Sequence, residues 1–246
     1  MKTYQTDFLL KNAERYGIAL SEKQITQFMQ YYEILVEWNS FMNLTAITEF
    51  DEVILKHFLD SITLEYAFTT CGKNFDYGDK CVIDIGTGAG FPGVPLKIVY
   101  PDMKITLLDS LNKRINFLNN VIEKLGLNGI ETIHGRAEDY SKPGKKREQY
   151  DLCVSRAVAN LSTLSEYCLP YVKTGGYFVP YKSEKTKDEI QAAGHALQIL
   201  GGVTESQAEF YLADTDIYRN LILIRKYEKT PVKYPRKSGL PAKEPL

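Results

Sequence analysis

Residues 81–95 read Cys-Val-Ile-Asp-Ile-Gly-Thr-Gly-Ala-Gly-Phe-Pro-Gly-Val-Pro, an apolar run followed by a turn dense in glycine. An apolar run that ends in such a turn predicts a β-strand that leads directly into a helix. Pro92 and Pro95 fit this interpretation, because the first turn of a helix tolerates proline. Glycine lets the backbone adopt positive φ angles and approach a ligand closely, and free amides at a helix start face its acceptor atoms. The stretch therefore predicts a ligand-binding turn at a strand end.

Downstream of this turn, short apolar or β-branched runs alternate with helical patterns. Including the first, the runs are 81–85, 104–108, 130–133, 151–155, 176–181, 207–212 and 220–225. Such alternation predicts a doubly wound, mostly parallel sheet. The last two runs are joined by about seven residues, Ala213 to Arg219, which is too few for a parallel crossover. We therefore predict an α/β fold with a seven-stranded, mostly parallel sheet that ends in an antiparallel hairpin.

The chain upstream of the sheet carries a helical pattern, and the chain downstream of it is basic and rich in proline. Ser21 and Gln24 have the spacing of a capping box at a helix start. The segment from Trp38 to Thr45 is expected to interrupt the helices. The predicted organisation is an N-terminal helical extension (1–68), a linker (69–80), a ligand-binding domain (81–226) and an extended tail (227–246).

The composition is that of an ordinary globular protein of 246 residues, with 44% hydrophobic and 25% charged residues. It excludes collagen-like, disordered and strongly supercharged chains. A formal net charge of −1 gives no support for a nucleic-acid partner, but it leaves room for a local basic patch. The four cysteines form no C-x-x-C pair, so we expect buried free thiols in a reducing compartment. With neither a signal-peptide pattern nor a long apolar window in the sequence, the expectation is a cytoplasmic protein without a membrane partner.

Two kinds of ligand fit the glycine turn. Gly88-x-Gly90-x-x-Gly93 matches the dinucleotide fingerprint, and Asp109 follows Gly88 by 21 residues, where a ribose-binding carboxylate would fall. However, Asp84 lies inside the first strand, where it would repel a pyrophosphate but suit an ammonium group. The antiparallel end of the sheet also departs from dinucleotide-binding sheets. Both details favour S-adenosylmethionine over a nicotinamide cofactor.

Short motifs along nearly the whole chain accompany the glycine turn. They are Trp38-Asn39, Met42-Asn43-Leu44-Thr45-Ala46-Ile47, His57-x-x-Asp60-Ser61, Leu108-Asp109-Ser110-x-x-Lys113-Arg114, Gly135-Arg136-Ala137-Glu138, Ser155-Arg156-Ala157-Val158-Ala159 and Tyr234-Pro235-Arg236-Lys237-x-Gly239-x-Pro241. In this combination the chain resembles the bacterial glucose-inhibited division protein B family of small-subunit ribosomal RNA guanine-N7 methyltransferases. The glycine motif is generic to class I methyltransferases, whereas the other motifs are specific. Tyr181-Lys182-Ser183 departs from the Lys-Gly or Lys-Ala pair that family members often carry.

The resemblance implies a class I methyltransferase fold, S-adenosylmethionine as cofactor, and cofactor contacts at Gly86, Phe91, Ala137-Glu138 and Arg156. To these the residue patterns add Gly88 in the turn and Asp109 as the acceptor of two ribose hydroxyls. Ligands in such sheets lie beyond the carboxyl ends of the strands, where most of these residues fall. The alternatives are a helix cap for Asp109, a solvated surface carboxylate for Glu138 and a structural ion pair for Arg156.

Guanine N7, the acceptor that the resemblance implies, has a free lone pair and no proton to lose. Methyl transfer to it is an in-line displacement at a sulfonium, for which no general base is required. We therefore assign no catalytic acid or base. His57 and Asp60, one helical turn apart, are expected to form a packing or hydrogen-bonded pair.

Binding of ribosomal RNA requires cations that neutralise phosphates. The candidates are Arg219, Lys226, Arg236 and Lys237, with the basic loop 142–147 as a weaker one, and each is alternatively a solvated surface charge. The implied partner is small-subunit ribosomal RNA or the small subunit itself, bound by a monomer that needs no metal. Two rival functions remain at this stage: a nicotinamide-dependent oxidoreductase, and a non-catalytic RNA-binding ribosome-assembly factor.

Overall fold

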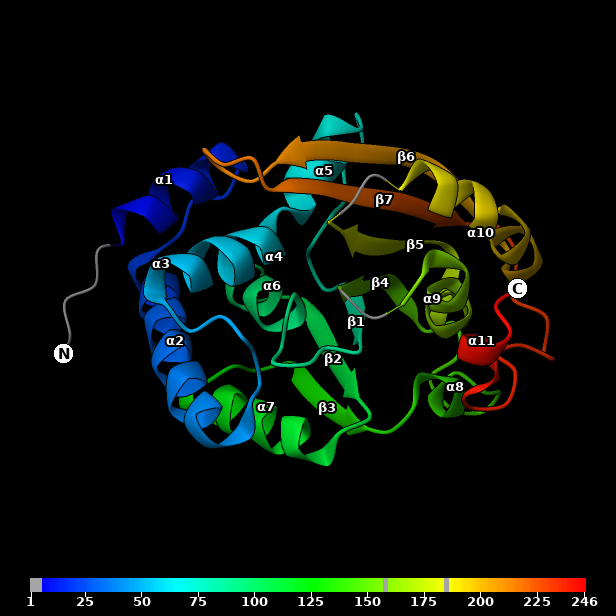
Figure 1. The fold of residues 1–246 in the computed structure, drawn as a ribbon, viewed down its shortest axis with the longest axis horizontal. Helices are drawn as coiled ribbons and strands as arrows, with labels where there is room; N and C mark the ends of the chain where they lie inside the picture. The colour runs from blue at the N-terminus through cyan, green and yellow to red at the C-terminus, as the bar shows by residue number, and fades with distance from the viewer. Residues whose placement is uncertain (1–5, 157–158, 184–185) are drawn as a thin grey trace.

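In the computed structural model, which describes residues 6–156, 159–183 and 186–246, helices cover both faces of one twisted sheet (Figure 1). Its strands are β1 (Cys81–Ile85), β2 (Lys104–Asp109), β3 (Ile130–His134), β4 (Tyr150–Arg156), β5 (Val172–Lys182), β6 (Gly202–Tyr211) and β7 (Tyr218–Lys226). They lie in the order β3-β2-β1-β4-β5-β7-β6. Strands β1 to β5 are parallel, and β7 runs antiparallel to both of its neighbours. The predicted seven-stranded sheet with an antiparallel terminal hairpin is confirmed.

Two strands are longer than their apolar runs predict. Strand β6 begins at Gly202, not at 207, because Gly201 adopts φ 79° and ends the preceding helix at once. Strand β5 begins at Val172, ahead of the predicted start at 176. Polar and glycine residues occupy the early part of each strand, so hydrophobicity alone underestimates their length.

Alternate residues of each central strand enter two separate cores. Val82 and Leu152 face one core, whereas their neighbours Ile83 and Cys153 face the other. The first core is covered by α6 (Gly93–Val99) and α7 (Asn112–Lys124), and the second by α8 (Ala137–Tyr140), α9 (Leu161–Cys168), the 3₁₀ turn η2 (Leu169–Tyr171) and α10 (Lys187–Leu200). This division is what a doubly wound sheet requires.

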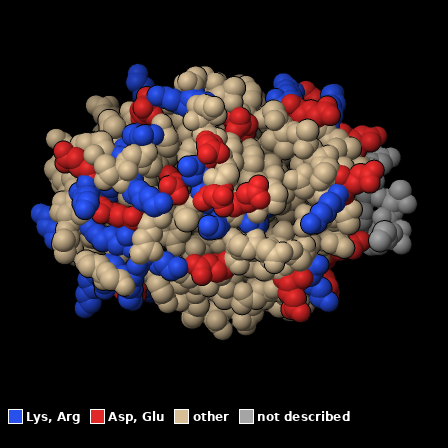
Figure 2. Space-filling model, turned by 180° about the vertical axis from the view of Figure 1, so that it is seen from behind, with Lys and Arg blue, Asp and Glu red and all other residues tan. Residues whose placement is uncertain are grey.

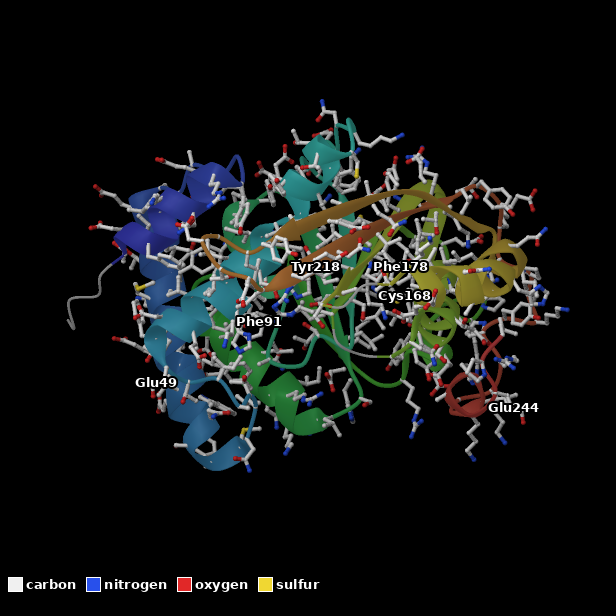
Figure 3. All side chains as sticks on the ribbon, turned by 45° about the horizontal axis from the view of Figure 1, so that its top comes forward. Glu49, Phe91, Cys168, Phe178, Tyr218 and Glu244 are labelled. Carbon is white, nitrogen blue, oxygen red and sulfur yellow. The ribbon has the colours of Figure 1, made fainter. Side chains whose placement is uncertain are left out.

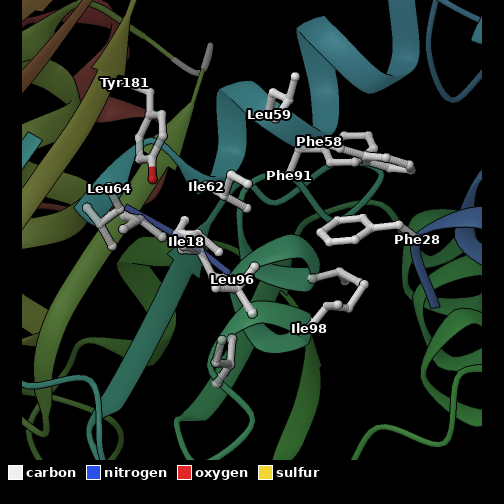
Figure 4. Close-up of a cluster of buried hydrophobic side chains, with 14 of the residues drawn as sticks. Ile18, Phe28, Phe58, Leu59, Ile62, Leu64, Phe91, Leu96, Ile98 and Tyr181 are labelled. Carbon is white, nitrogen blue, oxygen red and sulfur yellow. The ribbon is translucent and has the colours of Figure 1, made fainter. Parts of the chain in front are cut away.

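The N-terminal helices pack onto the first core and share it with the sheet. They are α1 (Asp7–Arg15), α2 (Glu22–Met42), α3 (Phe50–Val53), the π-helical turn η1 (Ile54–Leu59), α4 (Asp60–Ile62) and α5 (Leu64–Thr70). The Ser21–Gln24 capping box is confirmed, and α2 ends where Asn43 turns left-handed at φ 49°. Helix α5 continues to Thr70, two residues beyond the predicted boundary of the extension. Figure 4 shows Phe28 of α2 and Phe58 of η1 packed beside Phe91 of the glycine turn.

The chain after β7 is not wholly extended, as the sequence led us to expect. It forms a short helix, α11 (Leu240–Lys243), immediately after Gly239, which adopts φ 85°. This segment packs beside α8 and α9 at the end of the molecule opposite α1 (Figure 1). Across the described ranges, no helix combines the length and apolarity needed to cross a membrane.

Candidate active site

The carboxyl ends of β1, β2 and β3 border a pocket of about 380 Å³, the β1–β3 pocket. Its walls are formed by Ile85, Gly86, Leu108, Asp109, Ser110, Arg114, Gly135, Arg136, Ala137, Glu138 and Tyr167. Four of the predicted cofactor residues therefore meet here: Gly86, Asp109, Ala137 and Glu138. Glu138 is only 4% exposed, so the alternative of a solvated surface carboxylate is wrong.

The glycine turn needs its glycines for two different physical reasons. Gly86 and Gly88 adopt φ angles of 72° and 62°, which side chains disfavour. Gly90 has φ 95°, and a Cβ there would lie 2.6 Å from the hydroxyl of Tyr31 on α2. A Cβ on Gly93 would collide with the side chain of Leu107 in β2. The turn is thus packed tightly against the N-terminal helices and the sheet.

Asp84 is completely buried in β1, and only one of its carboxylate oxygens is satisfied. Oδ2 accepts hydrogen bonds from the Thr87 hydroxyl at 2.7 Å and from the Gly93 amide at 2.9 Å. Oδ1 has no hydrogen-bond partner within the described part of the chain, and burial raises the pKa of this carboxyl to about 6. An orphaned buried acceptor beside the glycine turn fits a ligand that carries a donor, such as the ammonium group of S-adenosylmethionine.

Asp109 is buried at the end of β2 and already accepts three hydrogen bonds. Oδ2 accepts from the Gly88 amide at 3.0 Å and from Arg114 at 3.1 Å, and Oδ1 accepts from the Leu111 amide at 2.9 Å. Because a carboxylate offers about four acceptor positions, room remains for about one ribose hydroxyl. A second hydroxyl would have to displace one of these three donors.

A larger pocket of about 850 Å³, the β4–β5 pocket, lies along the same edge of the sheet. Arg156 at the end of β4 and Lys182 at the end of β5 line it, together with Arg219 from β7. His57 and Asp60 reach it from the helical layer, where the π-helical turn η1 changes the helix register just before Asp60. Such turns recur at functional sites. The hydroxyl of Ser155 in β4 donates to the carbonyl of Ile85 in β1 at 2.7 Å, which links the two pocket floors.

Asp60 forms ion pairs with two arginines of the β4–β5 pocket. Its side chain is 2% exposed and accepts from Arg156 at 2.9 Å and from Arg219 at 2.8 and 3.1 Å. Arg156 also donates to the carbonyl of Lys56 at 3.1 Å. Arg156 is therefore both an ion-pair residue and a pocket residue, and it lies outside the walls of the β1–β3 pocket.

The predicted direct pair of His57 and Asp60 is replaced by an indirect one through Arg156. The Nε2 atom of His57 lies 2.9 Å from the Thr45 hydroxyl, and Nδ1 lies 3.4 Å from Arg156. Burial and the adjacent guanidinium lower the pKa of His57 to about 4, so its imidazole is neutral near pH 7.

Phe91 is buried beneath this cluster and does not line either pocket. Its ring stacks on His57 with centroids 4.5 Å apart, and the Arg156 guanidinium lies 5.2 Å from its centroid. Figure 4 shows the ring among the apolar side chains of the first core. The contact of Phe91 with the cofactor therefore stays a prediction, and the position of its side chain does not support it.

Comparison with known proteins identifies the family of the chain that carries these two pockets. The sequence model of the GidB family, described as rRNA small subunit methyltransferase G, matches residues 24–218. A ribosomal RNA small subunit methyltransferase G from Lachnoclostridium phytofermentans is 54% identical, covering 94% of this chain and 93% of its own. One from Clostridium novyi is 49% identical, covering 98% and 96%. This chain belongs to the rRNA small subunit methyltransferase G family.

Solved structures place the fold of this family member among the class I methyltransferases. A SAM-dependent methyltransferase from Aquifex aeolicus has a TM-score of 0.52 and 18% identity, covering 74% of this chain and 96% of that one. TYW2 from M. jannaschii, solved with AdoMet, has a TM-score of 0.50 and 14% identity, covering 61% and 69%. The predicted fold is confirmed, and membership of a methyltransferase family agrees with the predicted cofactor, S-adenosylmethionine. Membership of this family excludes the nicotinamide-dependent oxidoreductase.

One of the four predicted RNA contacts in this family member, Lys226, is contradicted by the structure. Lys226 is completely buried, and its ammonium donates to the carbonyls of Leu169 at 2.9 Å and Leu200 at 3.1 Å. Burial also lowers its pKa to about 7. Arg236 is partly exposed and pairs with the buried Glu166 at 2.7 Å, so Glu166 compensates its charge, and its contact with RNA stays a prediction.

The other two candidates differ in their surroundings. Arg219 lines the β4–β5 pocket as a partner of Asp60, whereas Lys237 is exposed. In the 142–147 loop, Arg147 donates to the carbonyls of Pro231 and Tyr234, so this cation is structural. Ala157 and Val158 of the Ser-Arg-Ala-Val-Ala motif lie outside the described residues.

Sequence patterns missed two residues of the β4–β5 pocket. Lys182 donates to Glu189 at 2.6 Å and to the carbonyl of Ala159 at 3.0 Å. Its position at the end of a parallel strand is the signal that could have identified it. Asp60 was interpreted only as a neighbour of His57, although a carboxylate on the apolar face between Phe58 and Ile62 demands a cationic partner.

Proposed function

We propose that this chain transfers the methyl group of S-adenosylmethionine to N7 of a guanine in small-subunit ribosomal RNA. The observation that carries the proposal is the pair of pockets at one edge of the sheet, joined where β1 and β4 pair. The β1–β3 pocket takes the cofactor, and the β4–β5 pocket takes the guanine. The names of the relatives, ribosomal RNA small subunit methyltransferase G, support the choice of RNA.

The residues of the β1–β3 pocket suit an adenosyl group. Asp109 has an acceptor position for a ribose hydroxyl, and Glu138 presents a second carboxylate on the wall. Asp84 lies behind the walls of this pocket, and its orphaned Oδ1 calls for a donor at the glycine turn. S-adenosylmethionine supplies the methyl group on a sulfonium that needs no further activation, so these residues only bind and orient it.

The residues of the β4–β5 pocket suit guanine. Its N7 and O6 are both acceptors, and N7 must stay free to attack, so a cation can donate only to O6. The cations that line the pocket are Lys56, Arg156, Lys182 and Arg219, and the carboxylates of Asp60, Asp188 and Glu189 largely balance their charge. A neutral His57 adds no repulsion toward the cationic product, 7-methylguanine. We assign no general base, because N7 has no proton to remove.

RNA must present the guanine unstacked, since a paired base cannot enter a pocket of this depth. On the face in Figure 2, Lys and Arg side chains gather toward the left end, with acidic side chains among them. Lys237 remains the candidate phosphate contact from the sequence. We propose that the enzyme acts in the cytoplasm, where its ribosomal substrate would be assembled, and that it acts as a monomer.

The proposal is tested by incubating the protein with labelled S-adenosylmethionine and small ribosomal subunits from cells that lack it. Naked ribosomal RNA is run alongside, and mass spectrometry identifies the modified nucleoside. We expect 7-methylguanosine. Label in another nucleoside would overturn the assigned acceptor atom. RNA binding with no incorporation into either substrate would favour the non-catalytic assembly factor.

A further inference from the structure

The chain after β7 turns back across the molecule as a strap, which we define as residues 227–246. Its first half is fastened to the body by backbone groups. The Thr230 amide donates to Glu148 at 2.9 Å, and Arg147 donates to the carbonyls of Pro231 at 3.2 Å and Tyr234 at 2.8 Å. The Tyr234 side chain is buried in the same core as Ala137. The strap is therefore part of the folded body.

The second half of the strap reaches the wall of the β1–β3 pocket. The Gly239 amide donates to Oε1 of Glu138 at 2.8 Å, and the Ser238 hydroxyl donates to Asp139 at 3.1 Å. Glu138 lines that pocket. The strap thus contacts α8 through two consecutive carboxylates. Figure 3 shows Glu244, just beyond α11, on the side of the sheet that also carries Cys168 of α9.

A second attachment supports α9 at the same wall. Glu166 accepts from the Arg236 amide at 2.7 Å and from its guanidinium at 2.7 to 3.1 Å. Its neighbour Tyr167 lines the β1–β3 pocket. The Thr163 hydroxyl, one turn earlier, donates to the Pro241 carbonyl at 3.1 Å. Both helices on this wall are thus held from outside by the strap.

These attachments matter because the two helices are too short to hold their own position. Helix α8 has four residues and α9 has eight, and isolated helices of that length are marginal in water. Glu166 is buried, so without Arg236 its charge would lack its main partner, and α9 would shift to hydrate it. A shift of α9 would move Tyr167.

We propose that the strap positions the wall of the β1–β3 pocket that α8 and α9 form, and so sets the affinity for S-adenosylmethionine. It does so through the hydrogen bond from Gly239 to Glu138 and the ion pair of Arg236 with Glu166. Arg236 and Gly239 are positioning residues, since they act through Glu138 and Tyr167. The inference rests on the proposed placement of the cofactor in the β1–β3 pocket. It gives Arg236 a role at the cofactor pocket, whereas the exposed Lys237 stays the candidate phosphate contact.

Calorimetric titration of S-adenosylhomocysteine into two full-length variants tests the proposal. R236A and K237A each remove one positive charge from adjacent positions, but only Arg236 has a buried partner. We expect R236A to bind about tenfold more weakly, the size of one charge-assisted hydrogen bond, and K237A to bind like the parent. In methyl transfer, R236A should raise KM for S-adenosylmethionine while kcat and KM for RNA stay unchanged.

Two further variants keep the test decisive. A chain ending at Arg236 keeps the Glu166 pair but loses Gly239, so it should also bind S-adenosylhomocysteine more weakly, even if R236A does not fold. Parent-like affinity in both R236A and the shortened chain would overturn the proposal. A loss of RNA affinity without loss of cofactor affinity would assign the strap to RNA instead. Full affinity in G86V would show that the cofactor lies elsewhere, which would refute its proposed placement in the β1–β3 pocket, whereas the proposed methyl transfer is tested separately by incorporation of label.

Discussion

A single buried carboxylate, Asp60, holds two strands against the helical layer. Arg156 from β4 and Arg219 from β7 both point their guanidinium groups at it, and all three side chains are largely buried. Two guanidiniums at one place repel each other unless an anion lies between them. The β4–β5 pocket therefore depends on Asp60 for both its charge balance and its shape.

Replacing Asp60 by alanine should lower the free energy of unfolding by about 3–5 kcal/mol, because it leaves two buried cations unpaired. Urea denaturation measures this change. D214A is the matched control, since Asp214 pairs with Arg15 at 2.8 Å but both side chains are more than half exposed. That surface pair should contribute less than about 1 kcal/mol. Equal losses in the two variants would contradict the assigned role of Asp60.

The buried imidazole of His57 makes stability depend on pH. Its pKa is about 4 in the folded chain and 6.5 when unperturbed, so between these values the unfolded chain binds a proton that the folded chain does not. Stability contributed by this residue should therefore fall as pH falls from 6.5 to 4, by about 3 kcal/mol in all.

The measurement is urea denaturation of the parent and of H57Q at several pH values across that window. Asp84 acts in the opposite direction. Its pKa is raised to about 6, so its contribution to the free energy of unfolding increases as pH falls from 6 to 3.8. Asp84 is present in both proteins, so the difference between them isolates His57. A difference that does not change with pH would contradict the lowered pKa.

At the scale of the element, the glycine turn tolerates little change, because two of its glycines have no room for a Cβ. Gly93 begins α6 against Leu107 of β2, and a Cβ there would also lie 2.9 Å from Oδ2 of Asp84. The turn has no room to move away, because Tyr31 of α2 donates to the Ala89 carbonyl from the other side. Crowding in such a packed place forces backbone shifts.

G93A should lower the free energy of unfolding by about 1–3 kcal/mol. G194A is the control, because Gly194 lies on an exposed face of α10 and a Cβ there meets nothing within 4 Å. It should raise stability by about 0.5–1 kcal/mol, since alanine favours helix. Thermal and urea unfolding give both values. Stabilisation by G93A would show that the turn is looser than its contacts imply.

At the scale of the whole molecule, the two ends of the chain cover opposite faces of the sheet. The N-terminal helices complete the first core, and the strap completes the second. Lys226 is the last residue of β7, directly before the strap, and its ammonium donates to the carbonyls of Leu169 and Leu200 at the ends of α9 and α10. The ammonium of Lys226 therefore makes hydrogen bonds inside the protein and is not available to RNA.

K226M should lower the free energy of unfolding by about 1–3 kcal/mol, because methionine fills the space but removes the ammonium that donates to the Leu169 carbonyl, whereas the Leu200 carbonyl still accepts from the Thr230 hydroxyl. Its affinity for ribosomal RNA should stay that of the parent, since Lys226 is completely buried. K229A, from the exposed part of the strap, should leave stability within about 0.5 kcal/mol. A selective loss of RNA affinity in K226M would restore the sequence-based interpretation.

Local pattern is enough to predict a property when short-range physics decides it. The alternation of apolar runs and helical faces predicted the sheet and its terminal hairpin, because burial imposes those periods on any such fold. The residues just after β1, β2 and β3 converge as predicted, since parallel strands end at one edge. The glycine turn and the capping box were predictable as well, because glycine and serine favour these local conformations whatever the rest of the fold.

The charges are where sequence reasoning failed, because a cation looks the same in a sequence whether it faces solvent or a buried carboxylate. Lys226, Arg236 and Arg147 were interpreted as surface charges, yet each has its partners at distant positions in the chain. Asp60 likewise finds its two arginines 96 and 159 residues away. By itself, the sequence determined the class of sheet, the glycine turn and the family. Only the tertiary structure decided which charges are free, because desolvation depends on neighbours that folding alone brings together.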